Sequence, residues 1–272
     1  MRNSELGRAG AVRHLWSEAD SLRERIADAP AIYAFFSFDA ALAQRASNGH
    51  SRTNPAARAA LIRLCAAPNT RGAVLSSRKA EVLQKRLRLH RLAYVGVHGA
   101  DVQAFGLRLV TEPNLEDAET AIQKLRRACS RMPALEAAGI VLEDRTWGLV
   151  LQLRNASPAD QVAAAEAFGT VVAGEGLSLR RGEDCLEAVP QGTGLARASL
   201  GLLAGLRDAL PVYAGAGEAD EEGFAAMNRR GGITIHVGPP PRSGTAARWQ
   251  VADAGEVIRL IHWLADARRQ TT

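Results

Sequence analysis

The chain has 272 residues, 47% of them apolar, and a formal net charge of +5. This length supports a sizeable core, in one large domain or two small ones. The sequence contains no run of 18 apolar residues, so we expect no membrane span. The basic residues occur as scattered pairs rather than as one patch interleaved with aromatic residues. We therefore expect neither a nucleic-acid nor a membrane partner, and interpret the pairs as solvated faces.

The first 30 residues predict an amphipathic N-terminal helix that has no signal-peptide core. Its apolar positions are Val12, Leu15, Leu22 and Ile26. The three cysteines, at positions 65, 129 and 185, lie far apart and show no metal-ligand spacing, so we expect them to be buried thiols. Together these features predict a cytoplasmic protein.

From residue 31 onward, strand-like apolar runs alternate with helical runs. Asn54 followed by Pro55 marks a helix start, because Asn caps helices and proline suits the first turn. Such alternation predicts a parallel sheet covered by helices. The expected strands are 31–39, 72–77 and 93–99, and the expected helices are 54–67 and 78–89.

The pattern changes to α+β between about 108 and 190 and then returns to strand–helix alternation. We therefore predict an α/β fold, in which a doubly wound parallel-sheet core at 31–107 and 191–272 is interrupted by an inserted cap domain at 108–190. The cap pattern comprises a strand-like run at 103–110, a helix around 114–137, a hairpin at 139–155, a helix at 157–168, and strands at 177–181 and 185–190. The later core pattern comprises helices at 192–206, 218–228 and 253–268 and strands at 210–217 and 232–238.

Four segments of the predicted core carry a family resemblance. They are "AFFSFDAAL" (34–42), "VLSSR" (74–78), "LAYVGVHGADV" (92–102) and "VYAGAGEADEEGF" (212–224). They resemble the trehalose-6-phosphate phosphatases of the haloacid dehalogenase superfamily, and the resemblance extends from about residue 31 to residue 268. It implies a haloacid dehalogenase-like Rossmannoid core with a cap.

The resemblance also locates the family's catalytic groups, and several are missing. Asp39 matches the general acid/base, whereas Ser37 stands where the family has its nucleophilic aspartate. The carboxylates that would hold Mg²⁺ fall on Ser37, Ala216 and Gly217, none of which is acidic. Phosphomonoester hydrolysis is extremely slow without catalysis, and Mg²⁺ requires hard oxygen ligands. The resemblance therefore implies a catalytically impaired pseudophosphatase that needs no cofactor.

Binding residues implied by the resemblance are retained in part. At the phosphate end they are Ser76, Arg78 and, as the cation nearest to the missing lysine clamp, Arg197. At the sugar end they are His98, Glu143, Arg145, Arg154 and Glu187. We accordingly expect the chain to bind trehalose 6-phosphate, or a related sugar phosphate, as a component of trehalose biosynthesis.

Two other functions stay open at this point. An atypical phosphatase would use Asp39 and a displaced Mg²⁺ on Glu218, Asp220 or Glu221, although such a cluster more often offsets a helix dipole. Alternatively, the chain is a structural partner of a trehalose-phosphate synthase. Dinucleotide binding is disfavoured, because "GAGEAD" and "GTGLAR" lack the third glycine or alanine of that fingerprint.

Overall fold

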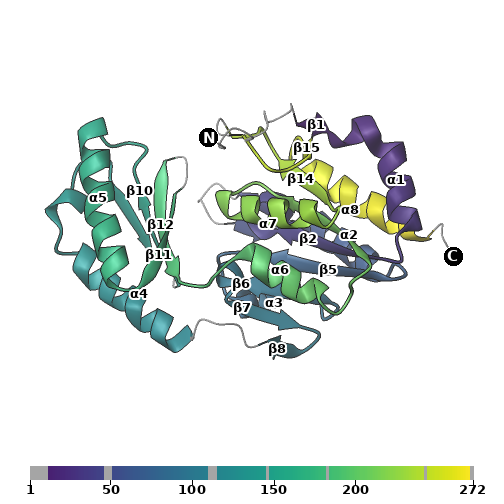
Figure 1. Cartoon of the computed structure of the whole chain (residues 1–272), viewed down its shortest axis with the longest axis horizontal. Coiled ribbons are helices and arrows are strands. Elements are labelled where there is room, and N and C mark those ends of the chain that lie inside the picture. Colours follow the sequence, from purple (N-terminus) through teal and green to yellow (C-terminus); the bar gives the residue numbers. More distant parts are fainter. Residues whose placement is uncertain are drawn as a thin grey trace, which may run out of the picture. The chain divides into compact units, whose positions relative to one another are not determined.

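The computed structural model describes residues 12–45, 51–109, 115–144, 147–181, 184–241 and 244–269. The chain folds into two compact units (Figure 1). The first unit comprises Met1–Val74 and Ser199–Thr272, and the second comprises Leu75–Ala198. The expected cap boundaries at 108 and 190 stay a prediction.

Strands within the described residues form one large sheet, a separate four-stranded sheet and the antiparallel pair β3 (Ala43–Arg45) and β4 (Ser51–Thr53). The strand order of the large sheet is β1-β15-β14-β13-β2-β5-β6-β7-β8. The bounds are β1 Arg13–His14, β2 Ala31–Ser37, β5 Thr70–Leu75, β6 Leu92–Gly96, β7 Asp101–Ala104, β8 Leu107–Leu109, β13 Ala209–Gly215, β14 Ile233–Val237 and β15 Trp249–Val251. This mostly parallel arrangement confirms the α/β prediction.

The first unit is built on parallel strands and the helices that pack on them. β2 pairs with β13, β13 with β14, and β14 with β15, all in parallel. Residues 32–37 of β2 are all buried, as expected for a parallel strand covered on both faces. Helix α8 (Ala254–Arg269) packs against α1 (Ala19–Asp28) and α2 (Pro55–Cys65), and α7 (Glu218–Arg229) packs against β13 and β14.

The second unit contains the antiparallel sheet and its two helices. Its strand order is β11-β12-β10-β9, and its core includes Ile122, Leu151 and Phe168. The strands are β9 Val141–Asp144, β10 Leu149–Gln152, β11 Leu177–Arg181 and β12 Cys185–Pro190. The helices of this unit are α3 Ala80–Leu87, α4 Leu115–Cys129, α5 Pro158–Gly174 and, shared with the first unit, α6 Leu195–Leu203.

Several expected boundaries are wrong, each for a local reason. The strand expected at 31–39 ends at Ser37, where a short π-helix, η2 (Phe38–Leu42), begins. The helix expected to reach residue 137 ends at Cys129, because the ring of Pro133 would clash with the carbonyl four residues earlier. The run 103–110 is not one strand but two, β7 and β8, joined at Phe105–Gly106.

The N-terminal helix is shorter than expected. Within the described residues, α1 begins at Ala19, after β1 and the 3₁₀ turn η1 (Leu15–Glu18). The expected core positions Leu15, Leu22 and Ile26 are nevertheless buried. The cysteine prediction is confirmed for Cys65 and Cys129, which are buried free thiols, whereas Cys185 is only half-buried. In the part of the chain that the structure describes, no helix is long and apolar enough to cross a membrane.

Candidate functional site

In the first unit, the residues expected to be catalytic lie at the carboxyl ends of neighbouring strands. β2 ends at Ser37, with Asp39 exposed on η2, and β13 ends at Gly215, followed by Ala216 and α7. Because β2 and β13 are parallel, both ends meet at one edge of the sheet, where ligands of α/β proteins usually bind.

The centre of this edge is the buried carboxylate of Asp220, only 4% exposed. Its Oδ2 accepts hydrogen bonds from the backbone N–H groups of Ala216 (3.0 Å) and Gly217 (2.9 Å). Its Oδ1 accepts one from the phenol of Tyr213 at 2.9 Å and one from the hydroxyl of Ser37. A carboxylate has about four acceptor sites, so these four donors saturate it.

The surroundings of Asp220 are shaped to keep this arrangement. A Cβ on Gly215 would collide with the Asp220 carboxylate, so only glycine fits there. Burial raises the pKa of Tyr213 well above its usual value, and the nearby Asp220 charge raises it further. Tyr213 therefore stays protonated and remains a hydrogen-bond donor to the carboxylate.

The residues at this edge do not fit a magnesium ion. Mg²⁺ requires an octahedral set of hard oxygen ligands, typically including one or two carboxylates. The positions that the resemblance assigns to those carboxylates hold a hydroxyl, a methyl group and a hydrogen, at Ser37, Ala216 and Gly217. The Asp220 carboxylate accepts four hydrogen bonds from the protein, one of them from the Ser37 hydroxyl, so its acceptor sites are not open to a cation.

The displaced acidic candidates are also dispersed. Glu221 accepts hydrogen bonds from the Thr245 hydroxyl at 2.7 Å and the Ala246 N–H at 2.6 Å. Its carboxylate therefore binds the segment before β15, whereas the Asp220 carboxylate binds groups at the ends of β2 and β13. Among the residues that the structure describes, no group of three or more His, Cys, Asp or Glu side chains could hold a metal ion. The described residues thus contain no cluster of ligands for the displaced magnesium site on Glu218, Asp220 or Glu221.

The expected phosphate-binding residues of the second unit form a compact turn. Ser76 is buried, and its Oγ accepts hydrogen bonds from the Arg78 N–H at 3.2 Å and the Arg78 Nη1 at 3.4 Å. The ammonium of Lys79 lies 4.8 Å from the ring centroid of Trp147. Asp101 accepts a hydrogen bond at 2.8 Å from the N–H of Ala80, the first residue of α3. Two adjacent cations therefore follow a buried serine, which suits an anion.

The expected sugar-binding residues are brought together only in part. His98 Nε2 lies 3.0 Å from Oε1 of Glu187 on β12, and both side chains are largely buried. The backbone that presents His98 is strained, because Val97 and His98 have φ values of +49° and +51°. Within the described residues, Nδ1 of His98 is buried without a hydrogen-bond partner.

Among the other expected residues, Glu143 lies in the same cross-strand row as Glu187, because both pair with Val150 of β10, so the two side chains emerge on the same face of the sheet. The exposed Arg154 side chain binds Asp184 at 2.8 Å, Glu143 lies on β9, and Arg197 is exposed, with its Nη1 3.4 Å from the Gly192 carbonyl. Arg145 lies outside the described residues. The structure therefore brings His98 and Glu187 into contact, and the binding roles of all these residues stay predictions.

The sequence does not predict the contact between Ser37 and Asp220. The two residues are 183 positions apart, and only the parallel pairing of β2 with β13 joins them. A local signal did exist. Asp220 lies three residues after the helix-capping Gly217 and accepts its N–H, which is the reciprocal half of a capping box.

Comparisons with known proteins agree with this layout. A trehalose 6-phosphate phosphatase of Zea mays is 28% identical over 218 residues, covering 72% of this chain and 59% of the relative. The trehalose-6-phosphate phosphatase of Escherichia coli K12 is 25% identical over 202 residues and 73% of each chain. The chain thus spans somewhat more than half of the maize relative's length.

Solved structures share the fold at low sequence identity. The C-terminal domain of Candida albicans trehalose-6-phosphate phosphatase has a TM-score of 0.73 at 16% identity, over 94% of this chain and 99% of that one. The C-terminal domain of the Candida albicans trehalose synthase regulatory protein has a TM-score of 0.67 at 12% identity, over 94% and 100%. The model of the trehalose-phosphatase family matches residues 35–254, well over half of the chain. The chain belongs to the trehalose-phosphatase family.

Proposed function

We propose that this chain is a cytoplasmic pseudophosphatase, which binds trehalose 6-phosphate or a related sugar phosphate without hydrolysing it. Its role would be to regulate or partner an enzyme of trehalose biosynthesis, with a trehalose-phosphate synthase as the partner. The observation that carries the proposal is the closed contact between Ser37 and Asp220 at the position where the resemblance puts the nucleophile.

Ser37 is poorly placed to replace an aspartate nucleophile. A serine attacks only when a base removes its proton, and the group that accepts its hydrogen bond is Asp220. That carboxylate already accepts hydrogen bonds from two backbone N–H groups and a phenol, so its acceptor sites are engaged in holding the fold. Hydrolysis of a phosphate ester needs a very large rate acceleration. A site with neither a carboxylate nucleophile nor a fitting magnesium site cannot provide it.

Binding groups support the other half of the proposal. Ser76, Arg78 and the adjacent Lys79 offer a hydroxyl and two cations to a phosphate. His98 and Glu187 offer a buried polar pair to sugar hydroxyls, and the strained backbone at His98 is a feature that clusters at ligand sites. The same fold occurs in the Candida albicans protein that is named a trehalose synthase regulatory protein.

The test is a single-turnover assay of phosphate release from trehalose 6-phosphate, with protein in excess and Mg²⁺ present. We expect no release above the protein-free blank from wild type. We also expect none from Ser37→Asp, because positions 216 and 217 still lack carboxylates. The Escherichia coli relative provides the positive control for the assay.

The second candidate, an atypical metal-dependent phosphatase, predicts the opposite result. Asp39 is exposed at the end of β2, where a general acid could reach a ligand. Magnesium-dependent release by wild type that disappears in Asp39→Asn would establish that enzyme and reject the pseudophosphatase.

A further inference from the structure

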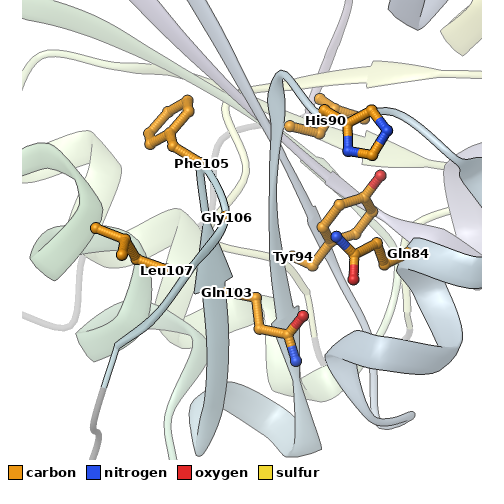
Figure 2. A pocket seen from close by; sticks show the side chains of 8 residues that line it. Gln84, His90, Tyr94, Gln103, Phe105, Gly106 and Leu107 are labelled. Carbon is orange, nitrogen blue, oxygen red and sulfur yellow. The ribbon is translucent and has the colours of Figure 1, made fainter.

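A cavity of about 270 Å³ in the second unit is lined by residues other than those of the candidate functional site (Figure 2). Four segments contribute its lining, namely the last turn of α3, the loop between α3 and β6, strand β6 and the hairpin of β7 and β8. The side chains that matter here are Gln84, His90, Tyr94, Gln103 and Phe105. The lining contains no Asp, Glu, Lys or Arg.

The floor of the cavity is fixed by strand pairing and by one phenol. Tyr94 on β6 lies directly opposite Gln103 on β7, so both side chains emerge on the same face of the sheet. The Tyr94 hydroxyl donates to the Leu89 carbonyl at 2.7 Å and accepts from the Leu89 N–H at 3.2 Å. These bonds hold the loop that carries His90 against the strand.

Two glutamine amides are available to a ligand at this cavity. Gln84 and Gln103 are half-buried, and among the residues that the structure describes neither side-chain amide has a hydrogen-bond partner. Each amide provides two donors and one acceptor oxygen. A ligand hydroxyl, which both donates and accepts, can use the oxygen and the NH₂ of such a group together.

The hairpin tip presents an aromatic ring at an energetic cost. Ala104 pairs with Leu107, so Phe105 and Gly106 form a two-residue turn, with φ values of +53° and +81°. Turns with two positive φ values favour Asn-Gly, and a phenylalanine in the left-handed region is strained. Phe105 is nevertheless 47% exposed, so packing in the core does not explain its presence. Strain of this kind is often retained where it serves binding.

We propose that this cavity binds the ring of a neutral hexose. The amides of Gln84 and Gln103 would bind ring hydroxyls, and Phe105 would cover the apolar C–H face of the sugar. The volume lies just below the range of about 300 to 1,000 Å³ typical for drug-sized ligands, which favours a single sugar ring over a larger molecule. The lack of Asp, Glu, Lys and Arg in the lining favours a neutral sugar over an anion.

The test is a titration of the full chain with glucose, followed by ¹H–¹⁵N NMR, for wild type and two variants. We expect saturable binding, weakened by roughly tenfold or more in Gln103→Leu and in Phe105→Asn, a change of about 1.4 kcal/mol. Gln250→Leu is the matched control, because Gln250 is a half-buried strand glutamine outside the cavity. It should bind glucose as wild type does.

Misfolding can be separated from a lost contact. Asparagine tolerates the left-handed region, so Phe105→Asn should melt at the same temperature as wild type or higher while losing affinity. Absence of saturable glucose binding to wild type, or unchanged affinity in both cavity variants, would overturn the assignment. Binding of glucose 6-phosphate without binding of glucose would also overturn it, because the phosphate would then be the recognised group.

Discussion

At the scale of single residues, Asp220 is the group on which the candidate site depends. Its carboxylate joins the end of β2, the end of β13 and the first turn of α7 through four hydrogen bonds. A buried carboxylate is stable only when its acceptor sites are filled, and here they are filled by the protein itself. Asp220, one of the three displaced metal candidates, therefore holds this edge of the sheet together.

This arrangement predicts a large effect of Asp220→Asn on stability. An asparagine would turn an NH₂ group toward donors and leave at least one of them unpaired. We expect the free energy of unfolding to fall by about 2–4 kcal/mol, and by about 1 kcal/mol in Ser37→Ala, which removes only one bond. Urea denaturation measures the free energy of unfolding of both variants, and Glu222→Gln, on the exposed side of α7, is the control. An Asp220→Asn variant as stable as that control would refute the network.

At the scale of elements, the last turn of α8 stabilises the end of α1. Arg268 is only 4% exposed, and its Nη1 donates to the carbonyls of Ile26 (2.9 Å), Ala27 (3.2 Å) and Ala29 (2.6 Å). The last carbonyls of a helix have no partner within the helix, and the helix dipole favours a cation there. One guanidinium thus terminates α1 and fastens it to α8.

Replacing Arg268 by methionine should therefore lower the free energy of unfolding by about 3 kcal/mol, because three carbonyls at the end of α1 lose a charged donor. Arg269→Met is the matched control, since Arg269 is its exposed neighbour on the same helix. Thermal or urea unfolding that gave equal stabilities for the two variants would show that the Arg268 contacts contribute nothing to the fold.

Elements with a local signal could be predicted from the sequence, and those without one could not. Asn54 caps α2 through its side chain, which accepts the Ala56 N–H at 2.9 Å, and Pro55 begins the helix as expected. Strands 177–181 and 185–190 were placed correctly, because alternating runs are bounded there by turn residues. β1 and β15 were missed, since strands of two and three residues carry too little periodicity to detect.

The candidate site was harder to predict because it depends on distant residues. Family resemblance located Ser37, Ala216 and Gly217, but the four donors around Asp220 come from β2, β13 and the turn before α7. The left-handed backbone at Val97 and His98 has no local cause in residue type, because glycine would be the usual choice for such angles. These positions follow from packing rather than from propensity.

At the scale of the whole molecule, the chain is an α/β protein of the trehalose-phosphatase family, made of two compact units. In the first unit, Ser37, Ala216 and Gly217 stand where the family resemblance expects metal-binding carboxylates. Hydrogen bonds from the protein itself fill the acceptor sites of the neighbouring Asp220 carboxylate. The second unit keeps a serine, two cations and a buried histidine–glutamate pair that suit a sugar phosphate. These two arrangements together are the basis of the proposal that the chain is a pseudophosphatase.

The most direct test is isothermal titration calorimetry of trehalose 6-phosphate into the purified chain, run once with Mg²⁺ and once with EDTA. A pseudophosphatase predicts the same saturating titration in both buffers, with no sustained heat after each injection and no free phosphate in the cell. Continuous heat that appears only with Mg²⁺ and rises with released phosphate would contradict it, and would show that the chain assembles a working metal site.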